Sequence, residues 1–264
     1  MPAKITLVLS LLWLCSCGAP VAGDSDALFR ELSPDQPVEL LYVKAATEVE
    51  YGASTAYGKM YGYIQVKNIA YHKQVTVHYA VGWDGEWQDL PAGYFMPLFD
   101  DDEVWYFESE DVPYSSRLSA DFRFAVKYEV DGREYWDNNH GNDYMISTGP
   151  RPLYPTDLVL GNRPLALARC GYHGWNGNFS GDIVLKNLAY DKTVEIIYTT
   201  DRWQTWASGY ATYFHPKTED TELWSFTLPV GGYSYYPEIE FAIRYRADGR
   251  DYWDNNFYRN YTYP

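Results

Sequence analysis

The chain has 264 residues, which corresponds to about two domains of ordinary size, and its 46% hydrophobic content excludes a wholly disordered protein. The formal net charge is −15 and Lys and Arg are nowhere clustered, so polyanions are repelled and nucleic acid is excluded as an expected partner. Aromatic residues make up 18% of the chain, with 27 Tyr and 10 Trp, which is typical of strands and of amphipathic contact surfaces. Together these values predict β structure and a neutral ligand that binds on an aromatic surface.

Residues 1–17 resemble a bacterial signal peptide that ends in a lipobox. The apolar run at 5–14 has the length of a signal-peptide core and is too short to span a bilayer. It is followed by Leu14-Cys15-Ser16-Cys17, in which Cys17 is the expected site of lipid attachment. The alternative is ordinary secretion with cleavage after Gly23. We therefore expect an exported protein, a lipoprotein of the bacterial cell envelope or otherwise secreted, that touches the membrane only through an N-terminal lipid.

The two halves of the chain repeat one sequence pattern. The segment 64–73 (IQVKNIAYHK) recurs at 183–192 (IVLKNLAYDK), and the segment 135–139 (YWDNN) recurs at 252–256. A repeat of more than 100 residues indicates a duplicated domain, since solenoids have periods of roughly 20–50 residues.

This repeat divides the chain into two modules. The first is assigned to 37–147 and the second to 157–264. Between them, residues 148–156 contain three prolines, which predicts a short, semi-stiff linker. Residues 18–36 are interpreted as a tether.

Hydrophobic residues alternate with other residues at a period of two in each module. The pattern is clearest at 122–130, and at 75–81 with its counterpart at 194–198. Several such short segments, separated by Gly, Pro, Asn and Asp, predict an all-β fold with two tandem β-sandwich domains.

One turn fixes the pairing of two strands in the first module. Asp131-Gly132 lies between two strand-like segments, and this dipeptide favours a two-residue type I′ turn. The resulting register pairs Tyr128 with Tyr135 on the core side of the sheet. It pairs Lys127 with Trp136 on the outer side.

The second module carries the same turn at Asp248-Gly249, which pairs Arg244 with Trp253 on the outer side. We therefore expect Trp136 and Trp253 to be exposed, since a large aromatic side chain outside the core is costly unless something covers it. The alternative is that a neighbouring loop or the sister module covers the indole.

Both copies resemble carbohydrate-binding module family 21. The resemblance rests on the segment 66–77 (VKNIAYHKQVTV), on Trp87 and on the segment 135–139 (YWDNN). That family includes the starch-binding domain of fungal glucoamylase and the glycogen-targeting subunits of type-1 protein phosphatase. The resemblance implies immunoglobulin-like β-sandwiches that bind α-1,4-glucan polysaccharide, either starch or glycogen, without hydrolysing it and without a cofactor.

The resemblance also implies two sugar sites in each module. The first would use Trp87 and Trp136, with Trp206 and Trp253 as the counterparts in the second module. An aromatic ring covers the C–H face of a sugar, whereas Asn and Lys offer hydrogen-bond partners to its oxygens. The second site would use these polar and aromatic residues in the two copies: Asn68, Tyr71, Lys73 and Tyr94, and Asn187, Tyr190, Lys192 and Tyr213.

One departure affects the first site. Ala125 and Ala242 stand where the starch-binding module has an aromatic residue, and the phosphatase subunits have Ala there too. The first site is therefore expected to be a shallow platform of two aromatic rings. For Asn68 and Asn187 the alternative is a turn residue.

Other functions remain as alternatives. A glycosidase requires two carboxylates across a cleft, and no acidic pair is repeated with neighbours that suggest such a site. The acidic run 100–103 suits calcium chemically, although such runs are usually just solvated, so no metal site is expected. A phosphatase-targeting adaptor requires a docking motif of the Arg-Val-x-Phe type, which the sequence lacks. An accessory subunit of an extracellular amylolytic enzyme is the remaining alternative, with that enzyme as the partner.

Overall fold

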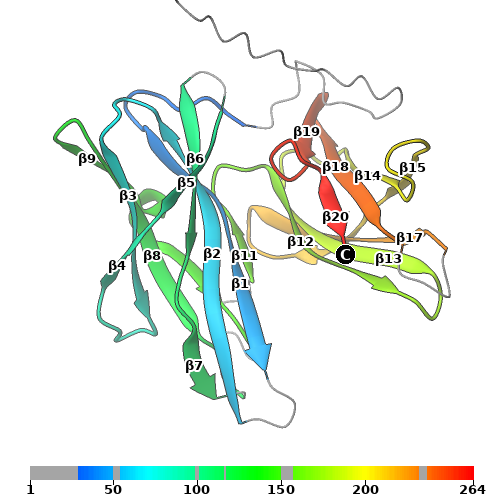
Figure 1. The fold of residues 1–264 in the computed structure, drawn as a ribbon, viewed down its shortest axis with the longest axis horizontal. Helices are drawn as coiled ribbons and strands as arrows, with labels where there is room; N and C mark the ends of the chain where they lie inside the picture. The colour runs from blue at the N-terminus through cyan, green and yellow to red at the C-terminus, as the bar shows by residue number, and fades with distance from the viewer. Residues whose placement is uncertain (1–28, 50–53, 99–100, 116, 150–156, 232–236) are drawn as a thin grey trace, which may run out of the picture.

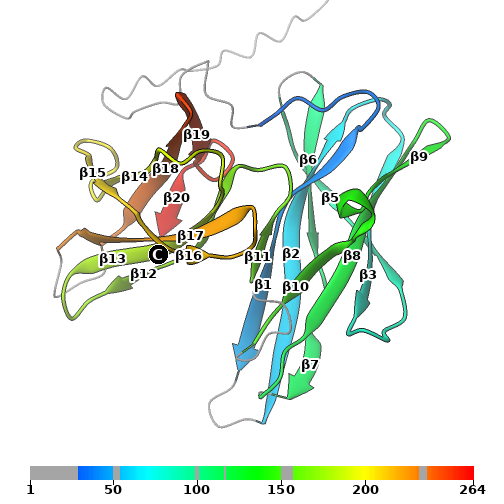
Figure 2. The same cartoon turned by 180° about the vertical axis from the view of Figure 1, so that it is seen from behind.

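The computed structural model describes residues 29–49, 54–98, 101–115, 117–149, 157–231 and 237–264. The expected signal peptide and Cys17 lie outside these residues. The described part forms four antiparallel sheets, two in each half of the chain, and Figures 1 and 2 show the two halves side by side. The predicted all-β fold with two tandem β-sandwiches is confirmed.

The first module contains two facing sheets. One has the strand order β11-β1-β2-β6-β5, with β7 also paired to β2, and the other has the order β10-β8-β3-β4, with β9 also paired to β8. The elements are β1 (Val38–Val49), β2 (Thr55–Lys67), β3 (Lys73–Val81), β4 (Gln88–Pro91), β5 (Gly93–Pro97), β6 (Asp102–Glu108), β7 (Val112–Ser115), β8 (Asp121–Val130), β9 (Arg133–Asp137), the 3-10 helix η1 (Asn139–Gly141), β10 (Tyr144–Ser147) and β11 (Leu158–Leu160).

The second module repeats this arrangement. Its sheets have the orders β12-β13-β17-β16 and β15-β14-β18-β19, with β20 also paired to β18. The elements are β12 (Leu165–His173), β13 (Asn178–Lys186), β14 (Lys192–Thr199), β15 (Ala207–Tyr210), β16 (Thr212–Pro216), β17 (Thr221–Pro229), β18 (Ile239–Ala247), β19 (Arg250–Asp254) and β20 (Tyr261–Tyr263).

The predicted hairpin register is confirmed in both modules. Tyr128 pairs with Tyr135 and Lys127 with Trp136 across β8 and β9, and the same pairs recur across β18 and β19. Asp131 and Gly132 have φ angles of 52° and 71°, which is the double positive φ that a type I′ turn needs. The pleat therefore sends the tyrosine of each hairpin to one side of its sheet and the tryptophan to the other.

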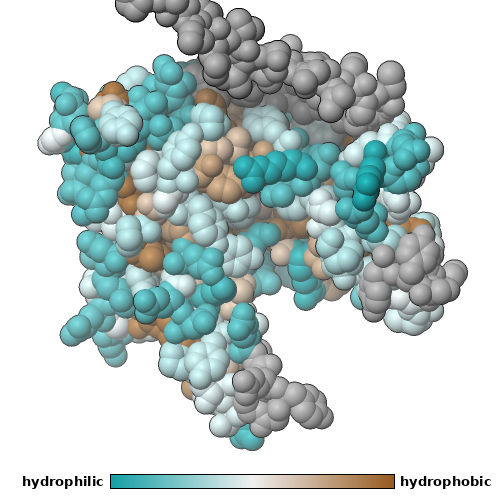
Figure 3. Space-filling model, viewed as in Figure 1, coloured by the Kyte–Doolittle hydropathy of each residue, from teal (hydrophilic) through white to brown (hydrophobic). Residues whose placement is uncertain are grey.

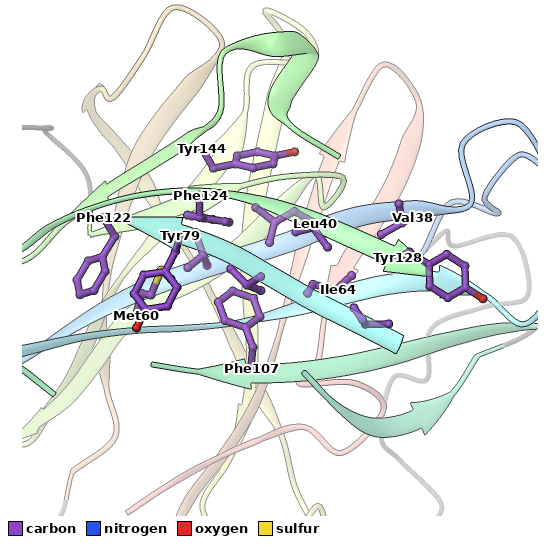
Figure 4. Close-up of a cluster of buried hydrophobic side chains, with 14 of the residues drawn as sticks. Val38, Leu40, Met60, Ile64, Tyr79, Phe107, Phe122, Phe124, Tyr128 and Tyr144 are labelled. Atoms are coloured by element: carbon purple, nitrogen blue, oxygen red, sulfur yellow. The ribbon is translucent and has the colours of Figure 1, made fainter. Parts of the chain in front are cut away.

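Each module has its own hydrophobic core between its two sheets. In the first module Leu40 and Ile64 from one sheet meet Phe124 and Tyr128 from the other (Figure 4). Tyr128 is fully buried and donates a hydrogen bond to the carbonyl oxygen of Lys67 (2.7 Å), and burial raises the pKa of its phenol to about 12. The prediction that this tyrosine points into the core is confirmed, and Tyr245 does the same in the second module.

The two modules pack against each other through a third hydrophobic cluster. At its centre Phe257, in the loop after β19, contacts the first module at Tyr63 (ring centroids 4.5 Å apart), Phe95 (5.5 Å) and Tyr42 (6.3 Å). Its side chain is 2% exposed. In the sequence repeat this position corresponds to His140, which lies in η1 of the first module. The modules are therefore joined by a built interface.

Two predicted boundaries differ from the structure. We expected the second module to begin at 157, but Leu158–Leu160 forms β11 and pairs with β1, so this strand extends a sheet of the first module. We also expected a tether over 18–36, but its described part packs on the first module. Leu32 is buried, and its backbone N–H donates to Asp102 Oδ2 (3.2 Å). Period-two patterns do not identify such short, nonlocal segments.

We predict that Phe257→Ala lowers the free energy of unfolding by about 3–5 kcal/mol, because it empties the centre of the interface between the modules. The matched variant His140→Ala changes the corresponding exposed loop of the first module and should alter stability by about 0.5 kcal/mol or less. Urea unfolding measures the change in the free energy of unfolding for both variants. Equal effects of the two substitutions would show that the interface contributes nothing to stability.

Candidate functional site

An aspartate ties the two sheets together at the end of each hairpin, half-buried in the first module and buried in the second. Asp137 Oδ2 accepts a hydrogen bond from the backbone N–H of Leu40 in the facing sheet (2.7 Å), and the Tyr144 hydroxyl donates to the same carboxylate (3.0 Å). Burial, together with this carboxylate, raises the pKa of Tyr144 well above its ordinary value. Asp137 directly follows Trp136, so this bond fixes the end of β9 and with it the position of the indole.

The second module uses Asp254 in the same way. It accepts from the backbone N–H of Leu167 (2.9 Å) and from the Tyr261 hydroxyl (2.7 Å), and it also pairs with the buried Arg163 (3.1 Å). The aspartates of the two Asp-Asn-Asn segments therefore have structural roles.

The outer face of the β8–β3–β4 sheet carries the first candidate site, which we call the tryptophan face of the first module (His78, Trp87 and Trp136). His78 lies between the two indoles: its ring stacks on Trp87 at 4.8 Å and meets Trp136 edge-on at 6.0 Å. Trp136 is 39% exposed. The structure thus brings together the two predicted tryptophans and adds a histidine that the sequence interpretation missed.

Polar groups surround these rings. The Arg123 guanidinium lies over the Trp87 ring at 4.7 Å, and the Lys127 ammonium lies over Trp136 at 5.9 Å. Asp89 holds His78 through Nδ1 (2.6 Å). Two groups therefore lie over Trp87 and one, Lys127, lies over Trp136, and the two indoles are similarly exposed, at 38% and 39%.

The corresponding face of the second module is closed, so the predicted exposure of Trp253 is wrong. Trp253 lies on the outer side of its sheet, as the register requires, but it is only 4% exposed. It packs with Ile197 and Ala242 beneath Phe29 and Trp203. The predicted partner Trp206 lies outside this cluster and is exposed.

The second candidate site, which we call the Asn–Lys site, has the same geometry in both modules. Lys73 lies at the start of β3, where its ammonium donates to Asn68 Oδ1 and forms an ion pair with Glu103 (2.9 Å). Trp105 Nε1 donates to the other oxygen of Glu103 (3.0 Å). Tyr94 then meets Trp105 edge-on at 6.2 Å.

The copy in the second module differs little. Lys192 donates to Asn187 and pairs with Glu222 (2.9 Å), Trp224 Nε1 donates to Glu222 (2.9 Å), and Tyr213 meets Trp224 at 6.3 Å. The two lysine side chains are almost buried, at 5% and 6% exposure, so each is held as a fixed donor.

The two loop tyrosines predicted for this site are almost fully exposed. Tyr71 and Tyr190 are 91% and 98% exposed, and the ring contact recorded for Tyr71 is with His72. Sequence interpretation in turn missed Glu103 and Trp105 with their counterparts Glu222 and Trp224. All four keep their spacing in the repeat, which is the signal that identifies them.

No metal site is assembled in the described residues. These residues contain no group of three or more His, Cys, Asp or Glu that could hold a metal ion. Asp102 and Glu103, from the acidic run considered for calcium, bind Leu32 N and Lys73 instead. No helix in the described ranges is both long and apolar enough to cross a membrane.

Comparison with known proteins gives the same assignment for both halves. The family model "Carbohydrate/starch-binding module (family 21)" matches residues 44–147 and 159–263, so the chain belongs to this family and contains two copies of its module. Glucoamylase 1 of Rhizopus oryzae is 39% identical over 102 residues, covering 37% of this chain and 15% of the relative. Protein phosphatase 1 regulatory subunit 3B of Homo sapiens is 34% identical over 86 residues, covering 31% of this chain and 30% of the relative. The match thus spans less than a third of the length of each of these two relatives.

Among solved structures, the chain is similar to the starch-binding domain of Rhizopus oryzae glucoamylase in complex with beta-cyclodextrin and maltoheptaose. The sequence identity is 34%, the similarity covers 38% of this chain and 99% of that one, and the TM-score is 0.29.

We predict that Asp137→Ala lowers the free energy of unfolding by roughly 2–4 kcal/mol, because it leaves the Leu40 N–H and the Tyr144 hydroxyl without their acceptor. Arg133→Ala, an exposed substitution on the same strand, is the matched control and should have little effect. Chemical denaturation measures both. If Asp137→Ala is as stable as the control variant, the aspartate has no structural role.

Proposed function

We propose that this protein binds α-1,4-glucan without catalysing its hydrolysis, through the tryptophan face of the first module and the Asn–Lys sites of both modules. The observation that carries the proposal is the open arrangement of Trp87 and Trp136 around His78 on a sheet of a family 21 module. Starch and glycogen are the α-1,4-glucans that we propose as ligands.

The side chains of the tryptophan face suit a sugar. The exposed indole of Trp136 offers an apolar surface for the C–H face of a glucose ring. Lys127 and Arg123 at the rings, and Asp89 beside them, supply donors and an acceptor for the hydroxyls. A sugar that stacks on Trp87 would meet His78 and Arg123 at the ring, whereas at Trp136 it would meet Lys127.

The surface also favours a neutral polymer. On the face drawn in Figure 3, hydrophobic side chains form small groups among polar ones, rather than one broad patch of the kind that binds apolar partners. The formal net charge of −15 disfavours polyanions. The named relatives support this proposal: one solved domain binds beta-cyclodextrin and maltoheptaose, and a relative in Drosophila melanogaster is called a glycogen-binding subunit.

Trp136→Ala should weaken binding of maltoheptaose to the tryptophan face by about 10–100-fold, because one stacked ring contributes roughly 1–3 kcal/mol if sugars resemble bases on aromatic side chains. Lys73→Ala and Lys192→Ala should each weaken the Asn–Lys site of their own module. Leu118→Ala, an exposed substitution at a residue that belongs to neither site, is the control. Isothermal titration calorimetry measures the affinity of each variant for maltoheptaose. Unaltered binding in all three site variants would refute these sites. Release of reducing sugar from starch by the wild-type protein would refute the non-catalytic role.

We also propose that the protein is exported and that Cys17 carries lipid, because Leu14-Cys15-Ser16-Cys17 follows an apolar core of signal-peptide length. The first described residue, Phe29, is twelve positions further on, so an anchor at Cys17 would hold the modules within about 40 Å of the membrane surface. Partner enzymes that degrade starch would meet the same polymer there.

For this anchor, mass spectrometry of protein purified from membranes should show an N-terminal peptide that begins at Cys17 with acyl chains. Cys17→Ser should release the protein from the membrane fraction, whereas Cys15→Ser should not. An unmodified N-terminus near Asp24 in the wild-type protein would mean ordinary secretion.

A further inference from the structure

The two tryptophan faces differ in what lies on them. Trp136 is 39% exposed, whereas Trp253 at the same position of the second module is 4% exposed. The hairpin register is the same in both modules, so the difference arises from what covers the sheet.

Phe29 lies on the closed face. It packs on the cluster of Ile197, Ala242 and Trp253, and its ring stacks on Phe257 at 5.8 Å. The Arg163 guanidinium lies over the same ring at 4.8 Å. Phe29 is therefore half-buried on the second module, with apolar, aromatic and cationic partners.

The residues that follow Phe29 are fastened to the first module. The Arg30 carbonyl accepts from Gln65 Nε2 (2.9 Å), and Leu32 is bound at its N–H by Asp102 and at its carbonyl by Lys67. We call residues 29–36 the strap. It holds Phe29 at the second module by a fixed anchor on the first, which lowers the conformational entropy lost when the ring binds.

The second module also differs at the positions beneath the ring. Ile197 replaces the His78 that joins the two indoles in the first module. Glu240 replaces Arg123, and its carboxylate accepts from Trp203 Nε1 (2.8 Å), which holds that second cover in place. Ile197 thus gives Phe29 an apolar contact where the first module has a polar ring, and Glu240 holds Trp203 beside it.

We propose that Phe29 occupies the tryptophan face of the second module, so that Phe29 and Ile197 determine which module binds sugar on tryptophan. Within the described residues the two modules then present one open tryptophan face and two Asn–Lys sites. This inference rests on the proposed function, because it concerns the accessibility of one of the sugar sites.

Hydroxyl-radical footprinting with peptide mass spectrometry tests the closure without any sugar. In the full chain, Trp253 should oxidise about ten-fold more slowly than Trp136, following their exposed fractions of 4% and 39%. Phe29→Ala and Phe29→Asp should raise the rate at Trp253 several-fold and leave Trp136 unchanged. Asp35→Ala, an exposed substitution in the strap, is the matched control and should behave as the wild type.

The same measurement with maltoheptaose separates the two proposals. The sugar should protect Trp136 in every protein and Trp253 only in the Phe29 variants. Absence of protection at Trp136 would refute sugar binding at the tryptophan face of the first module, whereas the oxidation rates without sugar would still report whether Phe29 covers Trp253. Equal wild-type rates at the two tryptophans, or a Trp253 that stays slow in both Phe29 variants while circular dichroism shows them folded, would overturn the closure by Phe29.

Discussion

The bond between Asp137 and the backbone of Leu40 is the constraint on which the binding surface depends. It joins the hairpin of one sheet to the first strand of the other, so the two layers of the sandwich cannot slide at that end. A carboxylate is the right group because it accepts several hydrogen bonds at once, here from a backbone N–H and a tyrosine hydroxyl. The preceding Trp136 is then held on the outer side by the pleat, so the position of the indole follows from a hydrogen bond between the two sheets.

The duplicated module shows how one fold gives two different outer faces. Asp254 keeps the sheets together in the second copy, and Trp253 keeps its place in the register. What changed are the neighbours: Ile197 stands for His78, and Phe257 stands for His140. Each replacement exchanges a polar ring for an apolar side chain, and each new side chain is buried, one below Phe29 and one in the interface. Positions that carry solvent-accessible histidines in the first copy have thus become packing positions in the second.

Local rules predicted much of this fold and part of the site. The Asp131-Gly132 turn and the period of two gave the register of the hairpin and the sides of Tyr128 and Trp136, because both are set within a few residues. The burial of Trp253 depends on Phe29, more than 200 positions away, and no periodicity reports such a contact. The repeat itself held the signal: two positions that should match, 78 and 197, carry His in one copy and Ile in the other.

The packed interface changes how two modules act on one polymer. Flexibly joined modules gain effective concentration according to the length of their linker, whereas packed modules present their sites at one fixed separation. Phe257, β11 and the strap each bind both halves of the chain, so the Asn–Lys sites of the two modules are set by the interface. If the Asn–Lys sites bind glucan as proposed, a polymer whose shape matches that separation would bind both without further ordering of the protein. Selectivity between glucans then depends on the shape of the polymer as well as on the contacts that each site makes.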